Sequence, residues 1–389
     1  MNSKSSKQPI KPLSGLRVLE IGQFIAVPAA AQILSDLGAD VIKLEPPSGD
    51  AARHAGWSRD EFGPMFSAYN RGKRSIALDL AQPEQREQAR RLALSCDVVL
   101  ANTRPGALEK VGLGADQLRP DAPRLIYGRV SGFGHSGASS RRPGFDAAAQ
   151  AESGMMSLNG DPAQDPMRVG FTVVDILASD MLTVGVLAAL LQRGLTGTGD
   201  LVDVTLIDVA VYALAAPWAQ YAQTGKVPLR LGNSQPLVAP AADVITTSQG
   251  QIILSAYMPS HFVRLCETIG RPELASDPRF ATNEARVANR AALLEELHEA
   301  MSHFDAETLV EKLSEGGIVA GVVRTMADVR PGRGGVSSDL FVNVTAAGRS
   351  DPMLLPGLPF GLATVAREAG PLPKVGEHTE QILTELGKR

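Results

Sequence analysis

The chain has 389 residues, of which 44% are hydrophobic and 21% are charged, and its formal net charge is −4 at pH 7. This length is enough for two domains, or for one large domain with an insertion, and the composition is that of a globular protein. The slight negative charge, with Lys and Arg dispersed along the chain, argues against a nucleic-acid partner.

Cysteines, the N-terminus and hydropathy indicate where the protein acts. Cys96 and Cys266 lie far apart in apolar segments, which indicates buried free thiols in a reducing compartment rather than a disulfide framework or metal cluster. Residues 1–12 lack the apolar core of a signal peptide and are expected to form a flexible tail. The longest apolar stretch, about 181–191, is expected to be too short for a bilayer. We therefore expect a cytoplasmic protein with no membrane contact.

The first half of the chain alternates strand and helix patterns. Branched apolar residues predict a strand over 16–22, a helical pattern follows over 24–38, and a second strand over 40–47 ends in prolines. Further strands are predicted at 75–80, 97–102 and 124–134, with an amphipathic helix over 82–96. Repeated strand–helix–strand units predict a doubly wound α/β domain with a parallel sheet.

The segment after the first strand lacks a dinucleotide-binding fingerprint. It reads GQFIAVP, with one glycine and a proline where a G-x-G-x-x-G turn would be needed. This argues against an NAD-dependent dehydrogenase. The carboxyl edge of the sheet should still form a ligand crevice, since glycines, amides and cations gather at the predicted strand ends.

The second half continues the α/β pattern and then changes character. A long apolar helix is predicted over 175–193, a strand over 201–208 and a helix over 209–223. A hairpin with its turn near Gln249 and Gly250 follows a connection rich in Pro and Gly. We expect a smaller α+β domain over 227–323, and a large Rossmann-like domain built from both chain ends, 13–226 and 324–389.

Asp175 stands inside the apolar run VGFTVVDILASDML. Burying an unpaired carboxylate costs several kcal/mol, so this acid needs a partner, a capping role or a chemical role. Two interpretations are open from the residues alone: a helix N-cap, where Asp is favoured, or a reactive carboxylate. Asp180 points to a different face, because five residues turn a helix by about 500°.

Several sequence blocks follow one another in the order found in a known protein family. They include LSGLRVLEIGQFIAVPAAAQILSDLGADVIKLEPPSGD, NRGKRSIALDL, NTRPGALEKVGL, PGFDAAAQAESGMMSLNGD, GLTGTGDLVDVTLID and GEHTEQIL. From about Leu13 to the C-terminus, the chain resembles the family III CoA-transferases of the CaiB/BaiF type. Relatives in that family include formyl-CoA, carnitine-CoA and benzylsuccinate-CoA transferases and the α-methylacyl-CoA racemases.

The resemblance implies that Asp175 is the nucleophile. A carboxylate can attack an acyl-CoA thioester to give a mixed anhydride, and returning CoA thiolate then gives an aspartyl-CoA thioester. We expect the helix N-terminus to hold Asp175 ionised through its N–H groups and dipole. Asp146, in GFDAAAQ, would either orient a loop or cap the next helix, and both interpretations stay open. Asp180 is expected to be a helix-surface residue.

The resemblance also implies a set of CoA contacts at the strand ends, where cations would meet the phosphates of CoA. The matching residues are Asn70, Gly72 and Lys73 near the nucleotide, Asn102, Thr103 and Arg104 beside adenosine and pantetheine, Lys110 at a phosphate, Ile25 and Ala26 beside the thioester, and Ser131 and Phe133 along the pantetheine arm.

Coenzyme A and its acyl thioesters are therefore the expected substrates. We expect a donor of the succinyl-CoA or acetyl-CoA type, a small organic acid as acceptor, and no permanently bound cofactor or metal. One alternative is an acyl-CoA racemase or epimerase, although Phe145 stands where the racemases carry their histidine base. The other is a non-catalytic CoA-binding protein. The resemblance further implies an interlocked homodimer.

Overall fold

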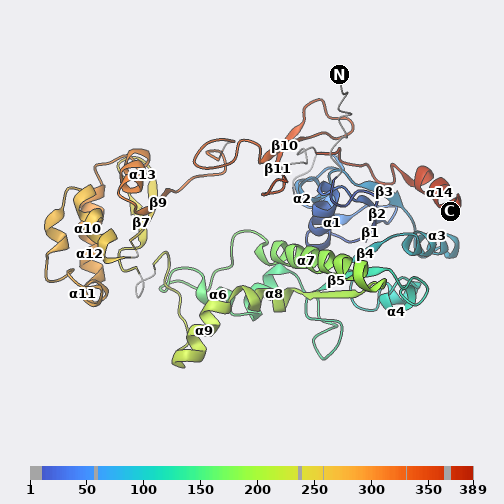
Figure 1. Ribbon diagram of the computed structural model, residues 1–389, viewed down its shortest axis with the longest axis horizontal. Helices are drawn as coiled ribbons and strands as arrows, with labels where there is room; N and C mark the ends of the chain where they lie inside the picture. The colour runs from blue at the N-terminus through green and yellow to red at the C-terminus, as the bar shows by residue number, and fades with distance from the viewer. Residues whose placement is uncertain are drawn as a thin grey trace, which may run out of the picture. The chain divides into compact units, whose positions relative to one another are not determined.

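The computed structural model describes residues 11–56, 60–234, 239–256, 258–329, 331–362 and 369–388 (Figure 1). Residues 1–10 of the expected tail lie outside this range. The chain divides into two compact units: the first comprises Met1–Met155, Val169–Ala216 and Pro331–Arg389, and the second Met156–Arg168 and Pro217–Arg330. The domain boundaries inferred from the sequence stay a prediction.

The first unit is built on a six-stranded parallel sheet with the order β3-β2-β1-β4-β5-β6. Its strands are β1 (Arg17–Ile21), β2 (Asp40–Glu45), β3 (Arg74–Ala77), β4 (Val98–Ala101), β5 (Ile126–Ser131) and β6 (Leu201–Thr205). The strand order reverses between β1 and β4, so a crevice is expected where their carboxyl ends diverge. The predicted doubly wound α/β fold is confirmed.

Helices cover both faces of this sheet, because successive strand residues point to opposite sides. Val18 of β1 belongs to the core formed with α1 (Ala26–Asp36), α7 (Val173–Thr196) and α8 (Leu206–Ala213). Its neighbour Leu19 belongs to the core formed with α3 (Pro83–Leu94), α4 (Ala115–Leu118) and α14 (Thr379–Gly387). The shorter elements of this unit are η1 (Ala51–Arg53), α2 (Pro64–Tyr69), η2 (Glu109–Val111) and α5 (Asp146–Glu152), and α6 (Met155–Leu158) begins at its boundary with the second unit.

Segments from the C-terminal part of the chain complete the first unit. Strands β10 (Phe341–Val344) and β11 (Met353–Pro356) form an antiparallel ribbon, and α14 lies against β3 and α3 (Figure 1). Arg17 and Arg74 both bind Glu385, at 3.0 and 2.9 Å. The unit is therefore assembled from segments that are far apart in sequence.

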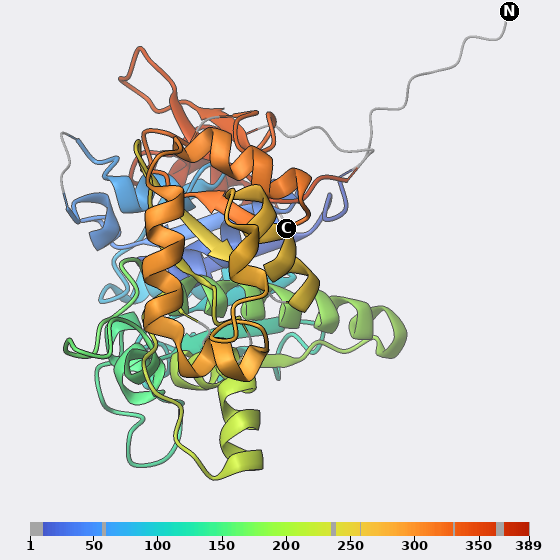
Figure 2. The same ribbon diagram turned by 90° about the vertical axis from the view of Figure 1, so that its left-hand side faces the viewer.

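The second unit contains an antiparallel sheet of β7 (Asp243–Thr246), β8 (Gln251–Ser255) and β9 (Val319–Val322). Its helices are α10 (Pro259–Thr268), α11 (Asn283–Ala288), α12 (Arg290–Met301) and α13 (Ala306–Glu315), with the turn η3 (Pro272–Ala275). These helices pack beside the strands (Figure 2). Buried residues such as Phe262 and Phe280 form the core between them. The predicted hairpin is confirmed, and Gly250 at its turn has φ 88°.

Two predicted boundaries are wrong. The strand predicted over 201–208 ends at Thr205, because Thr205 Oγ1 accepts a hydrogen bond from the Asp208 N–H at 3.1 Å and caps α8. The helix predicted over 209–223 is two helices, α8 and α9 (Ala215–Thr224), with Leu214 between them. The apolar pattern continues through both changes, so only the cap marks the first one.

The apolar helix α7 is longer than the sequence pattern indicates. It has 24 residues and, by length and composition alone, is apolar enough to cross a membrane, so the expectation that this stretch is too short is wrong. It extends to Thr196, where Gly197 adopts the left-handed conformation that ends helices. Within the first unit α7 packs on α1, β5 and β6, with Leu182 and Val186 fully buried. This packing is typical of the core helix of a globular domain.

Candidate active site

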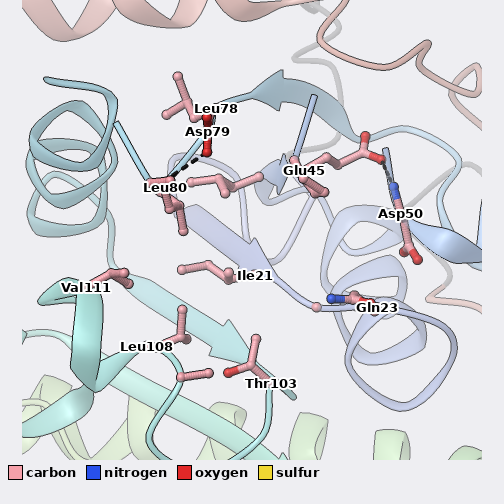
Figure 3. Close-up of a pocket in the computed structure, with 15 residues that line it drawn as sticks. Ile21, Gln23, Glu45, Asp50, Leu78, Asp79, Leu80, Thr103, Leu108 and Val111 are labelled. Carbon is pink, nitrogen blue, oxygen red and sulfur yellow. Dashed lines mark hydrogen bonds between the residues drawn. The ribbon is translucent and has the colours of Figure 1, made fainter. Parts of the chain in front are cut away.

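Two adjoining cavities open at the carboxyl ends of β1 and β4, where the strand order predicts a crevice. The first, the Asp175 pocket, has a volume of about 460 Å³ and is lined by Asp175, Ile25, Ala26, Asn102, Thr103, Arg104, Ser131, Gln23, Phe24, Ala107, Val130, Gly132, Gly144, Phe145 and Leu206. The second, the strand-end pocket, has a volume of about 360 Å³, and Ile21, Leu80, Leu108 and Val111 contribute apolar side chains to it (Figure 3). Gln23, Thr103 and Ala107 line both.

Asp175 is the third residue of α7, and it does not cap that helix. Thr172 holds the N-cap position. The capping acceptor is Asp146 at the start of α5, whose Oδ2 accepts hydrogen bonds from the N–H groups of Val174 at 2.7 Å and Asp175 at 3.3 Å. The N-cap interpretation of Asp175 is therefore wrong. Asp146 does not cap the next helix, α5, whose N-cap is Phe145, but the more distant helix α7.

The electrostatic surroundings of Asp175 oppose its ionisation. Burial and then the neighbouring Asp146 raise the pKa of Asp175 to about 7. The expectation that the helix N-terminus holds Asp175 ionised is wrong in this respect, because Asp146 already occupies the first N–H groups of α7. Among the described residues, no side chain forms a hydrogen bond or ion pair with the Asp175 carboxylate. Burial of Tyr69 in α2, and then the nearby charge of Asp175, raise the pKa of Tyr69.

The turn from β1 to α1 forms one wall of the Asp175 pocket. Asn102 clamps it by accepting from the Gln23 N–H and donating to the Gln23 carbonyl, both at 2.8 Å. Phe24 has φ 61°, a left-handed conformation that is costly for a non-glycine residue. Ile25 is the N-cap of α1 and has no side-chain acceptor to cap its first turn. The N–H groups at this helix start can therefore serve a ligand.

A buried ion cluster lies behind this wall and contains Lys73. Its ammonium contacts Glu20 at 2.6 Å, the Pro28 carbonyl at 2.8 Å and Asn70 Oδ1 at 2.9 Å. All three N–H donors of the lysine are thus used inside the protein. Burial lowers the pKa of Lys73 to about 8, against the attraction of Glu20. Lys73, Asn70 and neighbouring Gly72 line neither pocket.

The same cluster contains residues that sequence reasoning missed. Lys43 of β2 binds Glu20 at 2.7 Å and Asp50 at 2.9 Å, and nearby carboxylates raise its pKa despite full burial. Asp50 also accepts from the Phe24 N–H at 3.4 Å, which links the cluster to the pocket wall. A signal was present, because a charged residue in a strand buried on both faces requires a partner.

The remaining predicted residues lie at the pocket margins. Ser131 Oγ accepts from the Gly134 N–H at 3.0 Å and shapes the loop after β5. Phe133 lies outside the cavity lining and stacks under the guanidinium of Arg142 at 4.5 Å. Lys110 is exposed in η2, and its neighbour Val111 lines the strand-end pocket. Arg104 is exposed and lines the Asp175 pocket.

Comparison with known proteins identifies the family. Residues 13–379 match the family model described as CoA-transferase family III. The chain belongs to this family.

Relatives of this CoA-transferase resemble it over their full lengths. A probable fatty acyl-CoA transferase of Mycobacterium tuberculosis is 37% identical, over 97% of this chain and 99% of that protein. The succinyl-CoA–D-citramalate CoA-transferase of Chloroflexus aurantiacus is 34% identical, over 98% and 96% of the two chains. The crystal structure of a CaiB/BaiF family protein from Brucella suis superposes with a TM-score of 0.85 at 37% identity, over 97% and 99% of the two chains. The enzyme is therefore a CoA-transferase that uses CoA thioesters as substrates.

Proposed function

We propose that this CoA-transferase moves CoA from a donor of the succinyl-CoA or acetyl-CoA type to a carboxylic acid, with Asp175 as the covalent nucleophile. The Asp175 carboxylate attacks the thioester carbonyl, giving a mixed anhydride and CoA thiolate. The thiolate attacks the aspartyl carbonyl, which releases the donor acid and leaves an aspartyl-CoA thioester. The acceptor carboxylate attacks this thioester, giving a second mixed anhydride and CoA thiolate. The thiolate then attacks the acceptor's acyl carbonyl, which forms the new acyl-CoA and releases the Asp175 carboxylate.

One observation carries the proposal: a largely buried carboxylate without a partner side chain among the described residues lines the pocket at the sheet's switch point. A structural acid would be paired, because a buried unpaired carboxylate is costly. A pKa of about 7 leaves a substantial ionised fraction of Asp175 at neutral pH, and this fraction is more basic than an ordinary carboxylate. Such a group is suited to acyl transfer.

The two adjoining cavities support a binding mode for the CoA moiety. We assign the nucleotide to the strand-end pocket and the pantetheine arm to the shared wall at Gln23 and Thr103. The thioester would then meet the α1 N-terminus, where the N–H groups of Ile25 and Ala26 can stabilise a developing oxyanion. Arg104 and Lys110 are exposed cations on this route and would meet the phosphates.

The remaining expectations follow from this chemistry and from the family. One thioester is exchanged for another at similar free energy, so the proposed reaction needs neither ATP nor a resident cofactor or metal. We propose that the protein works as an interlocked homodimer in the cytoplasm. The exposed apolar side chains of Leu191 and Leu195 on α7 support a partner on that helix, since such residues are normally covered.

The test is covalent trapping. Incubation with acetyl-CoA and hydroxylamine should convert Asp175 to a hydroxamate, because hydroxylamine cleaves both the anhydride and the aspartyl thioester. Asp175→Ala should abolish both adduct and transfer, whereas Asp180→Ala on the exposed face of α7 should keep both. An adduct on another acid, or transfer by Asp175→Ala, would remove the mechanism. Exchange of the α-proton of a 2-methylacyl-CoA in deuterated water, without transfer, would favour the racemase alternative.

A further inference from the structure

An aromatic corner stands in the Asp175 pocket beside the nucleophile. The rings of Phe24 and Phe145 meet edge to face, with centroids 6.1 Å apart and an interplanar angle of 88°. Both residues line the pocket with Asp175. Phe145 is 62% exposed, so most of its ring surface is open to a ligand. The corner therefore offers an apolar surface to whatever approaches Asp175.

The chain holds both rings in place by specific means. Phe24 keeps its left-handed backbone between the Asn102 clamp on Gln23 and the hydrogen bond to Asp50. Backbone strain of this kind persists only where the surroundings impose it, and it gathers at functional sites. Phe145 immediately precedes Asp146, the residue that caps the nucleophile's helix. The position of its ring is thus tied to the position of Asp175.

Close backbone packing fixes the loop that carries Phe145. Gly132 and Gly144 both line the pocket, and a Cβ on Gly132 would lie 2.6 Å from the Cα of Gly144. Only glycine fits at this contact. The aromatic corner is therefore a built wall of the pocket, supported from the β5 side as well as from α5.

The charges of the pocket disfavour a second carboxylate on the substrate. Among the described residues that line it, Arg104 is the single cation, and it lies in the turn with Thr103 and Ala107, which also border the strand-end pocket. At the reacting end Asp175 lines the pocket, and Asp146 is buried behind it, where it accepts the Asp175 N–H. A distal carboxylate placed there would lose hydration without gaining a cation, and it would be repelled by both acids.

We propose that the acceptor is an apolar monocarboxylic acid, aromatic or alkyl, whose side chain packs against Phe24 and Phe145. This inference rests on the proposed function and adds the acceptor class to it. Because donor and acceptor acyl groups meet Asp175 in the same pocket, it also narrows the donor to the acetyl-CoA type. The acceptor's carboxylate faces Asp175, and its hydrocarbon end covers the exposed face of Phe145. An aromatic acceptor gains edge-to-face contacts in addition to burial.

A competition experiment tests this proposal. The enzyme receives acetyl-CoA as the donor and an equimolar mixture of 3-phenylpropanoate and glutarate, which differ at the distal end. Mass spectrometry then gives the ratio of the two acyl-CoA products. The wild type should favour 3-phenylpropanoyl-CoA by more than about tenfold. Phe145→Ala should lower that ratio by about two- to tenfold, the usual range for an aromatic pair. Phe145→Arg, which adds a cation, should shift it toward glutaryl-CoA.

A matched control and the failure outcomes complete the design. Phe171 is 60% exposed and lies outside both pockets, so Phe171→Ala should leave the product ratio unchanged. The product ratio does not depend on the amount of folded enzyme, so a partly unstable variant still gives an interpretable ratio. Glutarate preferred by the wild type, or an unchanged ratio in both Phe145 variants, overturns the acceptor class. Loss of the Asp175 adduct with every acid would instead overturn the proposed function.

Discussion

Asp146 and Asp175 are joined through the backbone, with Asp146 Oδ2 accepting the N–H of Asp175 at 3.3 Å. The contact brings a second carboxylate to the residue that needs to be ionised for attack. Burial is the larger cause of the raised pKa of Asp175, and Asp146 is the second. The capping residue therefore has two effects: it fixes the start of α7, and it makes Asp175 a stronger base.

The first prediction concerns the pH dependence of adduct formation on Asp175. Only the ionised carboxylate attacks, so the rate should rise with pH through an apparent pKa of about 7. Asp146→Asn retains an oxygen acceptor for the Val174 N–H but removes the negative charge. The pH at which the rate rises should therefore move to a lower value. It should remain above the ordinary carboxyl value, because burial persists. Stopped-time hydroxylamine trapping across a pH series measures the shift.

The control for that series is Asp146→Ala, which removes the cap as well as the charge. Losing a cap costs about 0.5–2 kcal/mol, so this variant should melt earlier than Asp146→Asn. If the rate of adduct formation rose at the same pH in Asp146→Asn and in the wild type, Asp146 would have no influence on the nucleophile.

The second prediction concerns stability. The pKa of Asp175 is about 7 in the folded protein and near its model value of 3.8 when unfolded. A carboxyl pKa raised by folding favours the folded state only while protonated, so stability is progressively lost from about pH 4 to pH 7. Asp175→Asn is neutral throughout. Its Tm advantage over the wild type should therefore grow between pH 5 and pH 7 and level off above, as thermal melts can show; a constant difference would contradict this.

The third prediction separates Lys73 from Arg104. Lys73→Ala leaves the Glu20 carboxylate buried with one cation fewer, and breaking a buried pair costs about 3–5 kcal/mol. We expect a clear fall in Tm. Arg104→Ala alters an exposed residue, so its unfolding should change by less than about 0.5 kcal/mol while its CoA affinity falls, most clearly at low salt. Calorimetric titration with CoA and thermal melts of both variants distinguish the two roles. A stable Lys73→Ala protein would contradict the buried cluster.

The fourth prediction concerns assembly. If two chains interlock, dilution should yield no folded monomer, and the unfolding midpoint should rise with protein concentration. Leu195 is 91% exposed on α7, so Leu195→Glu should leave a lone chain unaffected but disturb a partner contact there. Analytical ultracentrifugation over a wide concentration range decides the matter. A compact monomer at any concentration would exclude an obligate dimer.

Much of the sheet was predictable because its signals are local. The runs RVLEI and DVIKLE place branched apolar residues on consecutive positions, which is typical of a strand buried on both faces, and the helical stretch between them requires parallel pairing. Asp175 was noticeable for the same reason, since a charge in the first turn of an apolar helix stands out. Even Glu20 and Lys43 could have been paired from the pattern, because the parallel register places them opposite each other.

Contacts between distant segments could not be predicted in this way. Asp146 caps a helix that begins 27 residues further along the chain, at Val173. Lys73 points inward, to the Pro28 carbonyl of α1. Its direction depends on the space that the small side chains of α1 leave, and only the packing of the folded protein reveals that space. The start of α7 was expected to keep Asp175 ionised. Its pKa is raised instead, because the side chain is buried and because the neighbouring Asp146 accepts the first N–H groups of the helix.

The return of residues 369–388 to the first unit bears on how the protein is made. The Gly72 N–H donates to the Pro371 carbonyl, the His378 N–H donates to the Ser75 carbonyl, and Arg53 binds the Pro373 carbonyl at 3.1 Å. A ribosome delivers β2 and β3 long before these partners, whereas the second unit has all its strands once Val322 has emerged. The smaller unit can thus fold on the ribosome, while the larger one waits with an uncovered sheet edge. Translation speed and chaperone access should therefore affect the yield of the larger unit first.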